Sequence, residues 1–126
     1  MRLLKEALPR IRSRIQKLRP GPAGPMPILI AGRGERVMLR LVAEHAQMWN
    51  AIGSAEEYAR KSAVLDEWCR KVGRDPREIE RTANVGGLSP RAVDEWLQAG
   101  LQHFVLRVAH PFDTKDVARL LKVRDS

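Results

Sequence analysis

The first regular pattern of apolar positions in the chain lies in residues 1–19. Apolar side chains recur there at spacings of three and four residues, which predicts one stripe of an amphipathic helix: Leu4, Leu8, Ile11, Ile15 and Leu18. Pro9 interrupts the pattern, so the helix either begins at Pro9 or kinks there. Residues 20–27 are rich in Pro and Gly and predict a linker or crossing loop.

Four short apolar segments follow, and each precedes a helical pattern. The predicted strands are Ile28–Ile30, Met48–Gly53, Thr82–Val85 and His103–Val108, although a loop would also explain the second segment. The predicted helices run from Glu35 to about Ala46, from Ser54 to Gly73, from Ser89 to Gly100 and onward from Asp113. Strands that alternate with helices predict an α/β fold with about four parallel strands.

Capping residues mark the ends of these helices. Ser54 and Glu57 form a capping box, and Gly73 offers a left-handed stop. Asp113 is the expected N-cap of the last helix. The residues expected on buried helix faces are Met38, Leu39, Val42, Ala46, Tyr58, Leu65, Cys69, Val72, Val93, Trp96, Leu97, Val117, Leu120 and Leu121.

Length and composition limit the class of protein. A chain of 126 residues, with 44% hydrophobic and 30% charged residues, predicts one globular domain over residues 1–126. No long apolar run indicates a membrane span or a secretory signal, so a cytoplasmic protein is expected. Cys69 is the only cysteine and the histidines are scattered, so we expect no metal site and interpret Cys69 as a packed thiol.

The net charge of +8 is concentrated in the first third of the chain. Residues 1–40 contain ten Lys or Arg against two Glu, whereas residues 41–126 contain thirteen of each sign. A basic segment of this kind can serve nucleic acid, a membrane surface or a phosphate-bearing small molecule. A solvated outer face of the first helix explains it more simply.

The best chemical signal is the glycine turn that follows the first predicted strand. Gly32 and Gly34 allow a ligand close to the backbone, and the next helix would present free N–H groups to a phosphate. Arg33 and Arg36 could add two-pronged contacts to the same oxygens. The motif is incomplete as a dinucleotide or P-loop fingerprint, so a purely structural turn is an equal alternative. Glu35 by itself fits a favourable acid in a first helical turn.

Longer strings of residues resemble the luciferase-like monooxygenases, and the nearest likeness is to the deazaflavin (F420)-dependent oxidoreductase branch. The strings are Pro27–Glu35, Leu39–Ala46, Trp49-Asn50, Tyr58, Lys61, Val64–Cys69, Val72–Pro76, Ile79–Arg81, Ala99-Gly100, Leu120-Leu121 and Arg124-Asp125. This likeness covers most of the chain from about residue 7 onward.

The resemblance implies a (β/α)₈ barrel that binds FMN or F420 at the carboxyl ends of its strands. A full barrel takes about 250 residues, so the chain looks like the C-terminal half of one. The phosphate-binding turn of the family corresponds to Ala31, Gly32, Arg33, Gly34 and Glu35. Catalytic residues are not assigned, because the family's N-terminal half is absent.

A half-barrel also needs a partner, because two strand edges and one face of its sheet would otherwise remain uncovered. We expect a homodimer or a second chain that supplies the missing half, with nucleic acid a less favoured partner. The alternative function is a non-catalytic interaction module whose basic first helix binds nucleic acid or an acidic protein.

Overall fold

The structure is a computed structural model and describes residues 2–86 and 89–125. Within these ranges the chain forms a parallel β-sheet. Its strands lie in sequence order: β1 (Leu29–Ala31), β2 (Met48–Ile52), β3 (Glu80–Val85) and β4 (His103–Leu106). The helices are α1 (Arg2–Lys17), α2 (Met38–His45), α3 (Ala55–Val72), α4 (Pro90–Gln98) and α5 (Lys115–Arg124), with a 3₁₀ turn η1 (Pro76–Glu78) before β3. This arrangement confirms the predicted fold class, half of a (β/α)₈-type barrel.

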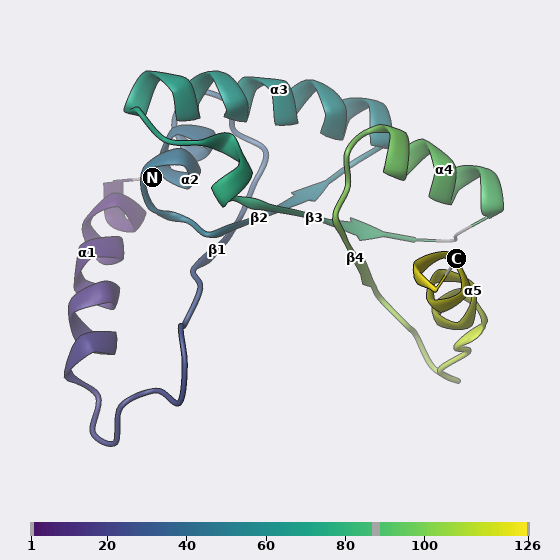
Figure 1. The fold of residues 1–126 in the computed structure, drawn as a ribbon, viewed down its shortest axis with the longest axis horizontal. Coiled ribbons are helices and arrows are strands. Elements are labelled where there is room, and N and C mark those ends of the chain that lie inside the picture. Colours follow the sequence, from purple (N-terminus) through teal and green to yellow (C-terminus); the bar gives the residue numbers. More distant parts are fainter. Residues whose placement is uncertain (1, 87–88, 126) are drawn as a thin grey trace.

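Helices α2, α3 and α4 cover one face of the sheet, whereas α1 and α5 lie at its two ends on the other side (Figure 1). The row formed by Ile30, Trp49 and Arg81 faces the covering helices. Trp49 is fully buried and stacks on Tyr58 of α3, with 5.6 Å between the ring centroids. The second apolar segment is therefore a strand, not a loop.

Helix α3 confirms the capping signals read from the sequence. The Ser54 hydroxyl accepts a hydrogen bond from the Glu57 N–H at 3.1 Å, and Gly73 ends the helix in the left-handed region at φ 73°. Among the residues expected to be buried, Tyr58 and Leu65 are, but Val72 is 38% exposed. The prediction for Val72 was wrong: the helical period continues to this residue, but it is the last of α3, and its side chain is only partly covered.

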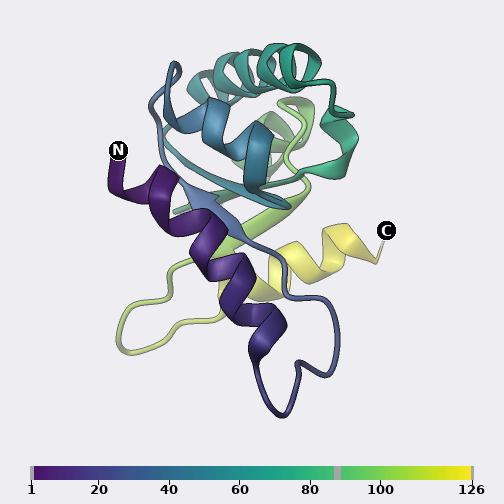
Figure 2. The same ribbon diagram turned by 90° about the vertical axis from the view of Figure 1, so that its left-hand side faces the viewer.

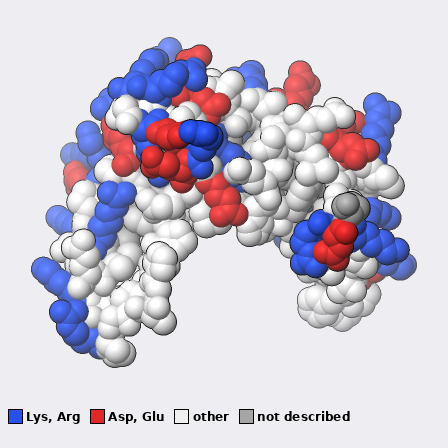
Figure 3. Space-filling view, in the orientation of Figure 1, with Lys and Arg blue, Asp and Glu red and all other residues white. Residues whose placement is uncertain are grey.

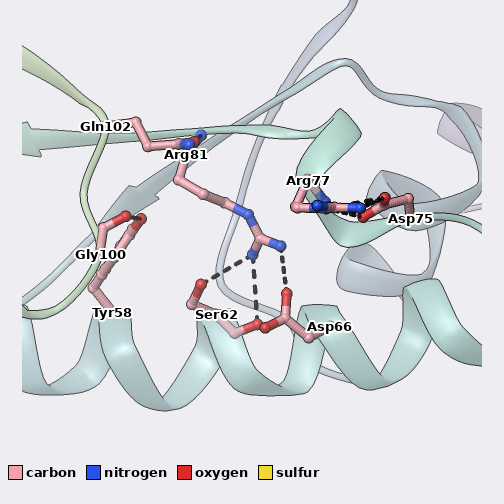
Figure 4. Close-up of polar contacts among 8 residues, drawn as sticks. All are labelled: Tyr58, Ser62, Asp66, Asp75, Arg77, Arg81, Gly100 and Gln102. Carbon is pink, nitrogen blue, oxygen red and sulfur yellow. Dashed lines mark hydrogen bonds and ion pairs between the residues drawn. The ribbon is translucent and has the colours of Figure 1, made fainter.

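Arg81 is a charged side chain in the layer between β3 and α3. Its guanidinium donates to the Ser62 hydroxyl at 3.0 Å and forms an ion pair with Asp66 (Figure 4). Tyr58, Ser62 and Asp66 follow one another at intervals of four residues and therefore share a face of α3. The contact places polar groups where the alternation of the strand predicts an apolar side chain.

Some predicted boundaries were wrong. Helix α2 begins at Met38, not at Glu35. The turn before it is closed by a bond from Leu39 N–H to Gly34 O, which spans five residues instead of the four of an α-helix. Strand β4 ends at Leu106, not at Val108. Leu97 was expected to be buried on α4, but its side chain is 43% exposed.

The last helix also departs from its prediction. Thr114, not Asp113, is the N-cap residue of α5, although the Asp113 carboxylate accepts a hydrogen bond from the Lys115 N–H at 3.0 Å. Leu121 is 43% exposed, and α5 has no fully buried residue. Leu120 is partly buried against the core, so the apolar stripe of α5 is covered only in part.

Helix α1 extends from Arg2 through Pro9 to Lys17, so a start at Pro9 was wrong. Only Leu8 of its apolar stripe is buried, and Ile11 is 42% exposed. Arg12 holds the helix to α2 by donating to the His45 carbonyl oxygen at 2.6 Å. Residues 18–28 form neither helix nor strand and lead back to β1 (Figure 2).

The face of the sheet away from α2–α4 is largely open. Leu29, Ile52 and Val105 point to this side and are 45%, 50% and 37% exposed. A hollow with few charges lies between the two ends of the molecule on this side (Figure 3). Four strands are too few to close a barrel, so this face and the outer edges of β1 and β4 lack the cover that a barrel supplies.

Candidate functional site

The predicted phosphate-binding turn lies at the carboxyl end of β1, where barrel folds place their ligands. Ala31 is the last residue of β1, and Gly32 to Glu35 follow it without a break. The Gly32 N–H donates to the Asn50 carbonyl oxygen at 3.3 Å, which continues the pairing of β1 with β2 for one residue. The turn therefore starts from a fixed position on the sheet.

Two indole groups hold the ends of this turn. Trp49 Nε1–H donates to the Gly32 carbonyl oxygen at 3.2 Å, and Trp68 Nε1–H donates to the Glu35 carbonyl oxygen at 2.8 Å. The sequence indicated only core or interface roles for both tryptophans. A contact to a backbone carbonyl 17 or 33 positions away leaves no local pattern, so no sequence signal could have found it.

The carbonyl oxygens of Gly32, Gly34 and Glu35 accept hydrogen bonds, but the N–H groups that follow Gly32 in the turn are free. Among the described residues, the backbone N–H groups of residues 33–37 donate to no other group. The first internal bonds that close the turn come from Leu39 N–H to Gly34 O at 3.0 Å and from Leu41 N–H to Val37 O at 3.1 Å. The turn thus presents several unused donors ahead of α2, which is the chemistry that binds an oxyanion.

Two arginines beside these donors are also unpaired. Arg33 and Arg36 are exposed and have no carboxylate within ion-pair distance in the described part of the chain. Glu35 does not neutralise them, because its carboxylate is paired with Arg60 of α3. An open hollow of about 630 Å³ is lined by residues 33–38.

The electrostatic surroundings of the turn are positive. Hydrogen bonding from Lys61 lowers the pKa of the Glu57 carboxyl, and Arg33 and Arg60 lower this pKa further. The ammonium group of Lys61 lies 2.6 Å from that carboxylate, so both charges of the pair are engaged with each other. The guanidinium groups of Arg33 and Arg36 remain available to an anion.

Gly32 has a packing role in addition to the one that the sequence suggested. A Cβ atom at Gly32 would lie 2.7 Å from Met38 Cγ, so the missing side chain makes room for Met38. Gly34 is less crowded, because a Cβ there would lie at the ordinary distance of 3.5 Å from Met38 Cβ. The donors that fit a phosphate are therefore those of residues 33–37, and Met38 occupies the space beside Gly32.

The other residues with reactive side chains do not form a second centre of this kind. Cys69 is fully buried, and burial raises the pKa of its thiol, as expected for a packed cysteine. Within residues 2–86 and 89–125, no group of three or more His, Cys, Asp or Glu side chains could hold a metal ion. No helix in those ranges has both the length and the apolar character to cross a membrane.

Comparisons with known proteins return little. No model of a protein family and no curated protein matches the chain. Among solved structures, the chain is similar to the coenzyme F420-dependent tetrahydromethanopterin reductase from Methanopyrus kandleri, at 20% sequence identity and a TM-score of 0.43. The match covers 48% of this chain and 17% of the reductase chain. The fold class stated above rests on the strand order and register, not on this likeness.

Proposed function

We propose that the chain is one half of a luciferase-like barrel oxidoreductase and that its 31–35 turn holds the phosphate of FMN or F420. The observation that carries this proposal is the run of unused N–H donors at residues 33–37 beside the unpaired guanidinium groups of Arg33 and Arg36. Donors without acceptors suit a fully ionised phosphate. The sequence resemblance adds the cofactor class.

Each part of the turn has a distinct role in this proposal. The two indoles fix the backbone by binding the Gly32 and Glu35 carbonyl oxygens. The N–H groups of Gly34 and Glu35, with the side chains of Arg33 and Arg36, bind the phosphate oxygens. Ala31 and Gly32 connect the turn to β1 and leave room for Met38. The cofactor, when bound, supplies the redox chemistry.

The rest of the cofactor site requires a second half-barrel. The open face and the two free edges of the sheet are the surfaces that this second half would cover. In a two-fold assembly, β1 of each copy lies beside β4 of the other copy. The two sheets then join into eight parallel strands. A partner chain that carries the missing half is the other source of the same surfaces.

Titration of the purified protein with FMN and with F420 tests the cofactor proposal. The fluorescence of the bound cofactor is expected to change saturably. In the double variant Arg33→Gln/Arg36→Gln, the dissociation constant should rise at least about tenfold, because two charge-assisted contacts are lost. No fluorescence change with either cofactor would contradict the proposal.

A matched control separates a local contact from an effect of net charge. The double variant Arg10→Gln/Arg14→Gln removes the same charge from the exposed face of α1 and should bind cofactor as the unaltered chain does. An equal loss in both variants would contradict a site at the turn. Salt-sensitive retention on DNA that only the α1 variant loses would instead support the nucleic-acid alternative.

A further inference from the structure

A chain of hydrogen bonds crosses the open face of the sheet. Asn50 and Thr82 are neighbours in the register of β2 and β3, and Asn84 lies one row nearer the carboxyl ends of the strands. The Thr82 hydroxyl donates to Asn50 Oδ1 at 2.9 Å, and Asn50 Nδ2 donates to Asn84 Oδ1 at 3.3 Å. Asn50 is 9% exposed and Thr82 is fully buried, so both depend on these bonds.

The direction of these hydrogen bonds determines which polar group Asn84 presents to solvent. Asn50 receives the Thr82 proton on its oxygen, so it must turn its NH₂ group to Asn84. Asn84 accepts that bond with its oxygen, and its own NH₂ group remains unused in the described structure. Asn84 is exposed and therefore offers hydrogen-bond donors to a molecule that approaches this face.

These donors line a hollow at the carboxyl ends of β2, β3 and β4. The hollow has a volume of about 430 Å³, and its lining residues are Ile52, Asn84, Val85, Gly86 and Arg107. Arg107 comes directly after β4 and has no carboxylate partner among the described residues. Asn84 Oδ1 is already engaged by Asn50, so the hollow presents mainly the N–H groups of Asn84 and Arg107, and Ile52 can contact a carbon skeleton.

Nearby carboxylates do not neutralise this hollow. Asp113 and Asp116 line an adjacent hollow that also includes Arg107. Asp113 is paired with Lys115 at 3.4 Å, and Asp116 is paired with Arg119 at 3.0 Å. Neither lies within ion-pair distance of Arg107, so its guanidinium retains its capacity for an external anion.

We propose that Asn84 and Arg107 form a binding site for the carboxylate of a small organic acid at the carboxyl ends of β3 and β4. A carboxylate has acceptors only, and a guanidinium fork with an amide NH₂ group supplies three or more donors to it. The half-exposed Ile52 side chain contacts the hydrocarbon part of the acid. The site is separate from the glycine turn after β1 and does not depend on the cofactor proposal.

An NMR titration with isobutyrate tests this site. The side-chain signals of Asn84 Nδ2 and Arg107 Nε in ¹⁵N-labelled full-length protein should shift saturably with isobutyrate. Isobutyramide, which has the same shape without the charge, should bind at least about tenfold more weakly. Equal shifts with the two compounds, or saturation that leaves both side-chain signals unmoved, would overturn the proposal.

Variants identify the residues that carry the binding. Arg107→Gln should weaken isobutyrate binding at least about tenfold and keep the fold, because this side chain is exposed and lies outside β4. Asn84→Asp, which replaces the donors by acceptors, should abolish saturable binding. Arg10→Gln, which removes the same charge from the exposed face of α1, is the matched control and should leave isobutyrate binding unchanged. A loss in the Arg10 variant as large as that in the Arg107 variant would also overturn the proposal.

Discussion

Arg81 shows how one side chain joins the sheet to its covering helices. The Arg81 side chain is 8% exposed and that of its partner Asp66 is 38% exposed, so the two sides of the ion pair differ in access to water. The guanidinium also donates to the Ser62 hydroxyl, and its central carbon lies 5.9 Å from the centroid of the Trp49 ring. The two partners should therefore differ in how much their removal costs.

Removal of Asp66 is expected to cost more stability than removal of Arg81. Asp66→Ala leaves a buried cation without its counter-charge and should lower the free energy of unfolding by about 2–3 kcal/mol. Arg81→Met fills the space with an apolar chain, and the freed carboxylate can be hydrated, so the loss should be about half as large. Urea unfolding measures both.

The exposed pair of Arg91 and Glu95 provides the control for this comparison. Arg91→Met should change the free energy of unfolding by less than about 0.5 kcal/mol, because a solvated pair contributes little. A larger loss in Arg81→Met than in Asp66→Ala would show that packing, not charge, dominates at this position.

Tyr58, the only tyrosine in the chain, should make the free energy of unfolding depend on pH in the alkaline range. Burial raises the pKa of its phenol from 10.0 to about 12, and the hydroxyl donates to the Gly100 carbonyl oxygen at 3.2 Å. The unfolded chain loses this proton first, so stability should fall as pH rises above 10 and level off near 12. The expected slope is about 1.4 kcal/mol per pH unit.

Tyr58→Phe isolates this effect from the titration of lysines in the same range. Unfolding of both proteins by urea at several pH values gives the difference. The slope assigned to the phenol should be missing from the variant. Parallel pH dependences in the two proteins would contradict the raised pKa.

Helix α3 is the element in which local sequence signals and structure agree most closely. Ser54 supplies a side-chain cap, whereas Thr114 at the start of α5 makes no side-chain cap bond. Ser54→Ala should therefore lower the free energy of unfolding by about 1 kcal/mol. Thr114→Ala should have little effect, and thermal unfolding measures both. Equal losses would contradict the assigned cap.

The elements of the sheet layer could be predicted from the sequence because their signals are local. Glycine stops, Ser caps and short β-branched runs identified the four strands and the helices between them. The beginning of α2 could not be predicted, because Val37 carries no capping group and the turn after Gly34 continues by backbone bonds alone. Whether Leu97 and Val72 are exposed depends on the residues that pack around them in the folded protein. Helical periodicity carries no information about those residues.

The candidate turn could be predicted only in part, for a similar reason. Glycines and arginines predicted a candidate anion site at residues 32–36, and the backbone N–H groups of residues 33–37 have no acceptor among the described residues. The indole bonds from Trp49 and Trp68 join positions far apart in sequence. The hydrogen bonds that join Thr82, Asn50 and Asn84 likewise exist only once β2 and β3 are in register.

At the scale of the whole molecule, the open sheet face is the surface that the proposed second half-barrel would cover. Sedimentation equilibrium at micromolar concentration should give twice the chain mass of 14.3 kDa. Ile52 is half-exposed on this face, and Ile52→Asp should give a folded monomer, because closing a barrel would bury its carboxylate. A monodisperse monomer of the unaltered chain would contradict closure by a second copy.

The most direct test of the central claim compares FMN with riboflavin, which lacks the phosphate. Calorimetric titration should show that FMN binds at least about tenfold more tightly than riboflavin. This difference should disappear in Arg33→Gln/Arg36→Gln, because the phosphate contacts are assigned to the turn after β1. Equal affinities for the two flavins, or a difference that persists in the variant, would contradict a phosphate site at Arg33 to Val37.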